Sequence, residues 1–422
     1  MDSIIVKGGN KLEGTINISG AKNAALPIMA ASLLTAEPLH LSNVPKLVDI
    51  KTMQELLTNH GSILKPENNS IIIDSSNIIS YKSPYDIVRK MRASIWTLGP
   101  LLARFREAEV SMPGGCAIGA RMIDQHLAVM KALGAKIKTK NGYIVAKSEG
   151  KLKGCHFNFT KLSVGATING ILAATLAEGE TILTNCAAEP EIVDLIVILN
   201  KMGANIKGAG TSKITIQGVR ELGGATHHLI GDRIEAGTFM CAVAMCGGKI
   251  NLKNIDYNIV ENIILKLKEA GVEFENLQDG TITVCAPNKV KGVDMQTEAY
   301  PGFATDLQAQ FMTLMTTASG SSAIAENIFE NRFMHVPELC RMGANITIDG
   351  HNAFVRGVET LSGAEVMASD LRASSSLIIA GLAAQGTTKV RRIYHLDRGY
   401  ENIEAKLNNC GAEIERIKGD SV

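Results

Sequence analysis

A five-residue stretch, Leu133-Gly134-Ala135-Lys136-Ile137, carries most of the information about the fold, because close variants of it occur six times along the chain. In each copy a glycine follows an apolar helical pattern and precedes a β-type run, and successive glycines are 68 to 73 residues apart. A glycine just beyond a helix supplies the left-handed conformation that ends it. The stretch therefore predicts six such helix ends, at Gly61, Gly134, Gly203, Gly271, Gly343 and Gly411.

A second pattern precedes these glycines: a helix of small residues, a polar turn and a strand, as at residues 31–38, 172–179 and 380–386. Helices rich in Ala, Gly and Ser can approach each other closely, so we expect them to be buried, with strands and amphipathic helices outside. The complete unit of about 70 residues reads helix–strand–helix–strand–strand. The repeats predict an α/β (α+β) fold of two globules with three units each; a continuous ring or solenoid is the alternative.

The composition is that of an ordinary globular protein, with 45% hydrophobic and 20% charged residues in a chain of 422. This length corresponds to two or three domains and is ample to bury a core. Lys and Arg number 43, and Asp and Glu number 42. The balance argues against a protein that binds nucleic-acid backbone or acidic membrane, although a local basic pocket could still take a small anion.

The sequence also bears on location and metal binding. The longest apolar candidate, residues 24–34, is shorter than the roughly 18 residues needed to cross a bilayer. The first residues lack the basic and apolar regions of a secretory signal. We therefore expect a cytoplasmic protein whose eight cysteines are free thiols. The cysteines form no CxxC pair, so no metal site is predicted.

Residues 19–25 (Ser-Gly-Ala-Lys-Asn-Ala-Ala) place a glycine turn before a helix, with Lys22 at or near its first turn. A cation there opposes the helix dipole unless an anion compensates it. A helix N-terminus beside a lysine is also a natural phosphate site. The segment thus indicates an anion site; an exposed lysine at no great cost is the alternative.

Residues 112–119 contain three glycines and one proline, which is typical of a mobile loop. Cys116 lies in this segment, so we expect it to be the one thiol that sees solvent. Arg121 and nearby backbone amides would lower its pKa. A buried small thiol is the alternative.

Two aspartates stand before apolar helical segments. Taken alone, Asp306 is best interpreted as a helix N-cap, and Asp370 could be a cap with Arg372 as its partner on a solvated face. Five cations, however, stand at expected helix or loop starts: Lys22, Arg121, Arg332, Arg372 and Arg398. In a neutral protein this placement suggests that a polyanion binds between two globules.

Seven motifs go beyond the repeat. They lie at residues 19–25, 91–94 (Met-Arg-Ala-Ser), 113–121, 165–167 (Gly-Ala-Thr), 331–338 (Asn-Arg-Phe-Met-His-Val-Pro-Glu), 370–373 (Asp-Leu-Arg-Ala) and 397–401 (Asp-Arg-Gly-Tyr-Glu). By these motifs the chain closely resembles the enolpyruvyl transferase (EPSP synthase) family, in particular its branch in bacterial cell-wall synthesis. The resemblance runs almost end to end, from Lys11 to Arg416.

The resemblance implies an inside-out α/β barrel of six repeats in two domains of threefold pseudosymmetry. One domain would hold residues 22–230, and the other residues 1–21 with 231–422. The active site is expected in the cleft between them. Residues 112–121 would form a lid that closes over the substrates.

The implied reaction transfers the enolpyruvyl group of phosphoenolpyruvate to the 3′-hydroxyl of UDP-N-acetylglucosamine and releases phosphate, by addition and elimination, without metal or organic cofactor. It needs a proton donor to C3, a base for the sugar hydroxyl, and cations for phosphate and carboxylate. The implied catalytic residues are Cys116, Asp306, Asp370, Lys22 and Arg398. Cys116 is the implied proton donor and covalent nucleophile, open to phosphonates such as fosfomycin. Asp306 is implied at the 3′-hydroxyl, with Asp370 helping proton traffic.

The resemblance also implies the binding positions. Those for phosphoenolpyruvate are Lys22, Asn23, Arg121, Arg332, Arg372 and Arg398, with Arg372 near the carboxylate. Those for UDP-N-acetylglucosamine are Arg92, Arg121, Met122, Ile123, Asp124, Gln125, Lys161, Leu162, Ser163, Val164, Asp306 and Ile328. These small molecules are the expected partners, without nucleic acid, membrane or an obligate protein partner.

Three other functions stay open at this point. A 5-enolpyruvylshikimate-3-phosphate synthase shares the implied fold and chemistry but not the cysteine lid. An enzyme acting on nucleic-acid ends, such as an RNA 3′-terminal phosphate cyclase, uses a related unit, but the neutral charge and the lack of interleaved aromatic residues argue against it. A non-catalytic repeat scaffold would not need so many cations at element starts.

Overall fold

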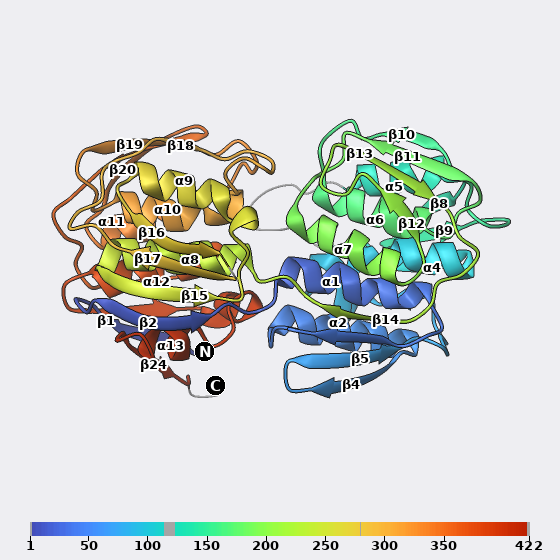
Figure 1. The fold of residues 1–422 in the computed structure, drawn as a ribbon, viewed down its shortest axis with the longest axis horizontal. Coiled ribbons are helices and arrows are strands. Elements are labelled where there is room, and N and C mark those ends of the chain that lie inside the picture. Colours follow the sequence, from blue (N-terminus) through green and yellow to red (C-terminus); the bar gives the residue numbers. More distant parts are fainter. Residues whose placement is uncertain (1, 114–122, 279, 420–422) are drawn as a thin grey trace. The chain divides into compact units, whose positions relative to one another are not determined.

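The computed structural model describes residues 2–113, 123–278 and 280–419, which divide into two compact units (Figure 1). The terminal unit contains the chain up to Ser19 and from Gly231 onward. The central unit contains the described residues from Gly20 to Ile230. The terminal unit is therefore built from both ends of the chain.

Within the described residues each unit contains three four-stranded sheets of one design. The first strand runs parallel to the second, and the third runs antiparallel to both the second and the fourth. In the central unit the sheets are, in strand order, β14 (Ala225–His228), β3 (Leu39–Ser42), β5 (Ser70–Asp74), β4 (Ile63–Glu67); β6 (Lys82–Ser83), β7 (Glu107–Ser111), β9 (Tyr143–Lys147), β8 (Lys136–Lys140); and β10 (His156–Asn158), β11 (Glu180–Thr184), β13 (Lys213–Gln217), β12 (Asn205–Lys207).

The sheets of the terminal unit repeat this design. They are β2 (Leu12–Asn17), β15 (Gly248–Lys253), β17 (Thr281–Cys285), β16 (Glu273–Gln278); β18 (Met295–Gln296), β19 (Ser321–Ala325), β21 (Asn352–Arg356), β20 (Asn345–Asp349); and β22 (Glu365–Met367), β23 (Thr387–Arg391), β1 (Ser3–Lys7), β24 (Glu413–Ile417). Strand β1 lies between β23 and β24, with Ser3 opposite both Arg391 and Ile417. The two ends of the chain thus complete one sheet.

Each repeat has a first helix before the second strand of its sheet and a second helix before the fourth. The first helices are α1 (Lys22–Ala31), α4 (Leu98–Phe105), α6 (Val164–Ala174), α8 (Arg233–Cys246), α10 (Gln308–Met315) and α12 (Leu371–Ala383). The second helices are α2 (Val48–His60), α5 (Asp124–Ala132), α7 (Pro190–Lys201), α9 (Glu261–Glu269), α11 (Val336–Arg341) and α13 (Ile403–Asn408). Shorter helical segments are α3 (Tyr85–Val88), η1 (Ser32–Leu34), η2 (Arg92–Thr97), η3 (Tyr257–Ile259), η4 (Thr305–Leu307) and η5 (Ile393–Arg398).

The core lies between the first helices and the sheets. Small residues make these helices buried almost all round, as α6 and α12 show. In the terminal unit α8, α10 and α12 pack against one another, and Figure 1 shows them lying inside the strands. The prediction that the small-residue helices are buried is confirmed.

The six glycines that were expected to end helices do so. Their φ angles are all positive, between 94° and 111°, and each stands just beyond a second helix, at Gly61, Gly134, Gly203, Gly271, Gly343 and Gly411. This backbone region costs L-residues about 1 kcal/mol or more and costs glycine nothing. No helix among the described residues is long and apolar enough to span a membrane.

Candidate functional site

Lys22 begins α1, as the sequence predicted, and its side chain is buried rather than exposed. Its Nζ lies 3.3 Å from Oδ2 of Asp49, a side chain with only 4% exposure in the first turn of α2. The turn before the helix requires Gly20, because a Cβ there would lie 1.7 Å from the carbonyl oxygen of Asn43. The internal carboxylate offsets the repulsion between the lysine and the helix dipole. The alternative of an exposed lysine is wrong.

Asp49 was missed in the sequence, although a signal for it exists. It shares the buried face of α2 with Thr52, Met53, Leu56 and Leu57, at the spacing of one helical stripe. An acid within an apolar stripe needs a buried partner. Lys22, 27 residues away, supplies that partner.

Three elements of the central unit bring most of the predicted nucleotide-sugar residues together. Gln125 donates from Nε2 to Oγ1 of Thr160 (2.9 Å), and its Oε1 accepts from the backbone N of Thr160 (3.0 Å). These bonds place residues 124–125 beside the segment 161–164. Asn169 of α6 donates from Nδ2 to the Ile95 carbonyl (3.1 Å) and to Nδ1 of His126 (3.2 Å). These contacts hold η2, which begins with Arg92, against α5 and α6.

The predicted side chains in this group differ in exposure. Lys161 and Leu162 are exposed, whereas Arg92, Ser163 and Val164 are partly buried, as is Asn23 of the predicted phosphoenolpyruvate positions. Ser163 caps α6 by accepting a hydrogen bond from the Ala166 backbone N at 3.3 Å. These positions form a polar surface around helix starts, where backbone N–H groups suit an anion.

His126 is the buried group behind this surface. Burial, with a smaller contribution from Arg92, lowers its pKa to about 4, while Asp124 acts in the opposite direction. At neutral pH the ring is therefore uncharged and accepts the Asn169 hydrogen bond at Nδ1. A neutral ring can support the helix starts without adding a cation to the site.

In the terminal unit, Asp306 of η4 lies between two arginines. Arg332 donates from Nη2 to Oδ1 at 2.7 Å, and Arg372 donates from Nη2 to Oδ2 at 2.7 Å. The arginine side chains are 4% and 5% exposed, and that of Asp306 is 27% exposed. Burial by itself would raise the pKa of Asp306, but Arg372 and Arg332 hold it well below its ordinary value of 3.8. The carboxylate is ionised at neutral pH and remains partly open to solvent.

These contacts correct two readings of the sequence. Asp306 forms no helix cap, because its carboxylate is taken by the arginines. Arg372 does not lie on a solvated face, since it is 4% exposed. The capping interpretation is confirmed for Asp370, whose Oδ1 accepts from the backbone N of Arg372 (2.8 Å) and Ala373 (3.1 Å) at the start of α12.

The Tyr400 hydroxyl contacts the guanidinium of Arg372 through a nitrogen that does not bind Asp306. Its Oη lies 3.4 Å from Nη1 of Arg372 and accepts from Nε2 of Gln310 at 3.1 Å. Thr238 of α8 lies 2.9 Å from the same Oη. The sequence motif at 397–401 includes Tyr400, but no role was predicted for this residue. Its contacts come from three elements that are far apart along the chain.

Of the remaining predicted positions, some lie within the described residues and others outside them. Ile328, 41% exposed, and Arg332 lie in the loop between β19 and α11. Arg398 ends η5 and does not start an element, which corrects that part of the expectation. Cys116, Arg121 and Met122 lie outside the described residues, and Ile123 immediately precedes α5.

The seven cysteines within the described residues are free thiols, and one of them corrects an expectation. Cys340 of α11 is exposed, so Cys116 is not the one thiol that could see solvent. Burial raises the pKa of Cys186 to about 11 and that of Cys246 to about 12. Such thiols are poor nucleophiles at neutral pH.

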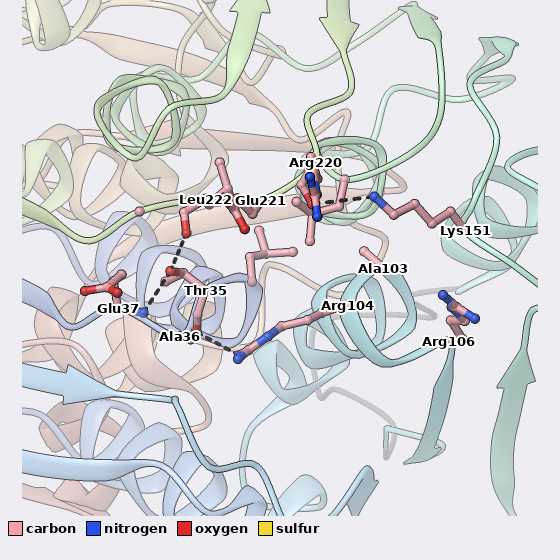
Figure 2. A pocket seen from close by; sticks show the side chains of 13 residues that line it. Thr35, Ala36, Glu37, Ala103, Arg104, Arg106, Lys151, Arg220, Glu221 and Leu222 are labelled. Carbon is pink, nitrogen blue, oxygen red and sulfur yellow. Dashed lines mark hydrogen bonds between the residues drawn. The ribbon is translucent and has the colours of Figure 1, made fainter.

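A cavity in the central unit has a volume of about 530 Å³, and Figure 2 shows the side chains that line it. Its lining includes Arg104, Arg106, Lys151 and Arg220, and contains none of the predicted site residues. Arg104 donates from Nη1 to the carbonyl oxygens of Leu33, Thr35 and Ser75. This arginine therefore binds carbonyl groups at the ends of η1 and β5, and the cavity is not the candidate site. Within the described residues no cluster of His, Cys, Asp or Glu side chains could hold a metal ion.

The repeat fold places two buried cation–carboxylate clusters, Lys22–Asp49 and Arg332–Asp306–Arg372, at or near helix starts. A model of the family described as EPSP synthase (3-phosphoshikimate 1-carboxyvinyltransferase) matches residues 6–407. The chain belongs to this family, the enolpyruvyl transferases.

Two relatives show which members of this family the chain is similar to along its whole length. The chain is 60% identical over 421 residues to the UDP-N-acetylglucosamine 1-carboxyvinyltransferase of Rickettsia bellii (strain OSU 85-389), covering 99% of this chain and 100% of the relative. The protein of the same name from Rickettsia felis is 59% identical over the same coverage.

Solved structures agree on the fold. The enolpyruvyl transferase NikO from Streptomyces tendae has a TM-score of 0.89 at 24% identity and covers 98% of both chains. An EPSP synthase from Acinetobacter baumannii has a TM-score of 0.78 at 18% identity, covering 99% of this chain and 100% of that chain. The predicted two-domain α/β fold is confirmed, and the solenoid alternative is wrong.

Proposed function

We propose that this chain transfers the enolpyruvyl group of phosphoenolpyruvate to the 3′-hydroxyl of UDP-N-acetylglucosamine and releases phosphate. The observation that carries the proposal is Asp306, an ionised carboxylate held between two buried arginines and still partly open. A hydroxyl acceptor and an anionic donor need such a pairing of base and cations. Identity of 60% along the whole chain to relatives named for this reaction supports the choice of substrates.

The roles follow the chemistry. Asp306 takes the proton of the sugar 3′-hydroxyl while the 3′-oxygen of the sugar bonds to C2 of phosphoenolpyruvate. Cys116 gives a proton to C3. The C2–O bond to phosphate then breaks, C3 returns a proton to the Cys116 thiolate, and the C2–C3 double bond forms again. Lys22, Arg121 and Arg398 bind the phosphate in this proposal, and Arg372 binds the carboxylate. Asp370 assists the proton transfers.

The low pKa of Asp306 makes it a weak base while both arginines hold it. In the proposal, phosphoenolpyruvate offers the arginines other anionic partners. Asp306 then becomes more basic when the donor is bound, since Coulombic stabilisation of its charged form decreases. Donor binding and proton transfer are thereby coupled.

The acceptor distinguishes the main alternative. A 5-enolpyruvylshikimate-3-phosphate synthase would use shikimate 3-phosphate with the same donor, and nothing in the described residues favours it. The polar helix starts of the central unit suit the diphosphate of the nucleotide sugar. The reaction is placed in the cytoplasm as part of the same proposal.

The test is phosphate release from phosphoenolpyruvate by the purified protein with each acceptor in turn, with the product identified by mass spectrometry. The expected product is the enolpyruvyl ether of UDP-N-acetylglucosamine. Turnover with shikimate 3-phosphate alone would contradict the proposal, as would the absence of turnover with both acceptors.

A further inference from the structure

Glu326 is a buried carboxylate that neither the sequence motifs nor the proposed roles account for. It follows β19 directly and is 1% exposed. Oε1 accepts hydrogen bonds from Thr297 Oγ1 (2.9 Å) and from the backbone N of Ile328 (2.9 Å) and Phe329 (3.1 Å). Oε2 accepts from Thr305 Oγ1 at 2.9 Å. All four donors are hydroxyl or backbone groups, and none is a basic side chain.

A buried carboxylate is costly, and these charge-assisted hydrogen bonds offset the cost by ordering what donates them. One oxygen orders the backbone of the loop 327–329. The other orders Thr305, the residue before Asp306. Glu326 therefore connects the loop that carries Ile328 to the turn that carries Asp306.

The orientation of the Thr305 hydroxyl links Glu326 to Arg332. The hydroxyl has one hydrogen, which it gives to Glu326, so its lone pairs face Nη1 of Arg332 at 3.4 Å. Arg332 in turn donates to Asp306 from Nη2 and lies with its guanidinium 5.3 Å from the Phe329 ring centre. Glu326 therefore reaches the Arg332–Asp306 pair by two routes, through the Thr305 hydroxyl and through the loop that carries Phe329.

We infer that Glu326 is a positioning residue that fixes Asp306 and the Ile328 loop in one geometry for the acceptor sugar. The inference rests on the proposed function, in which Asp306 and Ile328 contact UDP-N-acetylglucosamine. Glu326 touches no substrate. Its carboxylate sets the orientation of the Thr305 hydroxyl and of two backbone amides, and these set the acceptor site.

Glu326→Gln is the decisive variant, because the amide keeps the shape but changes one acceptor into a donor. An NH₂ facing Thr305 reverses the hydroxyl, whose hydrogen then points toward Arg332. We expect the KM for UDP-N-acetylglucosamine to rise about tenfold or more, since a charge-assisted hydrogen bond is replaced by a repulsive contact. The KM for phosphoenolpyruvate should rise less, because Arg332 is the one implied phosphoenolpyruvate residue in the described part of the chain that borders this network. Lys22, Arg372 and Arg398, which the structure also describes, form no hydrogen bond with Glu326 or Thr305.

The matched control is Glu298→Gln, the same change at an exposed glutamate that accepts a hydrogen bond from the Gln296 side chain. It should leave both KM values unchanged. Thr305→Val should reproduce the loss and Thr305→Ser, which keeps the hydroxyl, should restore it. This second pair decides the matter if Glu326→Gln fails to fold. Unchanged KM values, or equal rises for both substrates, would overturn the inference.

A separate readout keeps this inference distinct from the proposed function. Crystal structures of the wild type and Glu326→Gln should show a moved Asp306 carboxylate and a rotated Thr305 side chain in the variant. If the wild type has no activity with UDP-N-acetylglucosamine, the proposed function fails, and these structures alone decide whether Glu326 positions Asp306. An unmoved Asp306 would refute the positioning role.

Discussion

At the residue scale, Asp306 supplies the counter-charge for two arginines with side chains less than a tenth exposed. Removing one member of such a cluster leaves buried charge uncompensated. We expect Asp306→Asn to lower the free energy of unfolding by about 3 kcal/mol, measured by urea denaturation at pH 7. Asp349→Asn, in an exposed hairpin, is the control and should change it by less than about 0.5 kcal/mol. An equal, small effect of both substitutions would show that the arginines find other partners.

The pH dependence of this cluster has a definite sign. A carboxyl whose pKa is lower in the folded protein stabilises it above the unfolded pKa, and this stabilisation is lost as the pH falls further. Because the arginines hold the pKa of Asp306 well below 3.8, its contribution is complete at neutral pH. Its acid loss begins only below about pH 4.

Because the pKa of His126 is lowered, we expect a loss of folding stability in a higher pH range than for Asp306. The pKa of His126 is about 4 when folded against 6.5 unfolded, so protonation favours the unfolded chain and stability is lost from about pH 6.5 downward. We expect His126→Gln, which cannot titrate, to reduce the difference in unfolding free energy between pH 7 and pH 5 by about 2 kcal/mol. Urea titrations at both pH values measure it.

Some pH dependence should remain in the His126→Gln variant. The pKa of His335 in the terminal unit is also lowered to about 4, chiefly by burial, so it titrates in the same window. His351→Gln, the same substitution at an exposed histidine, is the matched control. If His126→Gln leaves the pH dependence as in the wild type, His126 does not carry the predicted penalty.

At the scale of an element, α12 begins at a carboxylate that has two candidate tasks. Asp370 caps the helix through Oδ1, and the proposal also gives it a part in proton transfer. Asp370→Asn keeps the capping oxygen and should change stability by less than about 0.5 kcal/mol, whereas Asp370→Ala should cost about 1 kcal/mol. Turnover should fall in both variants. Full activity in Asp370→Asn would reduce Asp370 to a helix cap.

The six helix-ending glycines allow a comparison between equivalent elements. At Gly343, φ is 96° and an added Cβ would meet nothing within 4 Å. At Gly61, φ is 111° and the Cβ would lie 2.6 Å from the Asn77 carbonyl oxygen. We expect Gly343→Ala to cost about 1 kcal/mol from backbone strain alone and Gly61→Ala to cost about 2 kcal/mol or more. Thermal unfolding of the two variants tests the ranking, and equal losses would contradict it.

At the scale of the whole molecule, the terminal unit depends on both chain ends. Ser3 pairs with Ile417, and the Gly419 backbone N donates to Asp2 Oδ1 at 3.1 Å. A short Gly/Ser linker can therefore join these ends. We expect a chain of residues 231–419, linker and 2–19 to fold alone, since it restores β1 between β23 and β24 and β2 beside β15.

Circular dichroism and thermal melting would test this permuted chain. Residues 231–419 without 2–19 are the control and should fail to melt cooperatively, because they lack the third strand of one sheet and the edge strand of another. Cooperative melting of that control would show that the N-terminal strands are dispensable for the unit.

The sequence by itself determined the repeat, the helix ends and the buried small-residue helices. These features depend on the backbone conformation of single residues and on spacing within one helix, so short stretches such as 133–137 contain them. The family and most of the proposed site positions also followed from local motifs. The roles of all these site residues stay predictions, and Cys116, Arg121 and Met122 also lie outside the described residues.

Only the tertiary structure decided which charges meet. Lys22 pairs with Asp49, 27 residues away, and Asp306 pairs with arginines 26 and 66 residues away. Taken alone, Asp306 was interpreted as a cap, and a solvated face stayed open for Arg372. A capping residue and a buried ion-pair member look alike in sequence when the partners lie on separate elements. Partner choice is set by how helices and loops pack, and burial then makes each pairing strong.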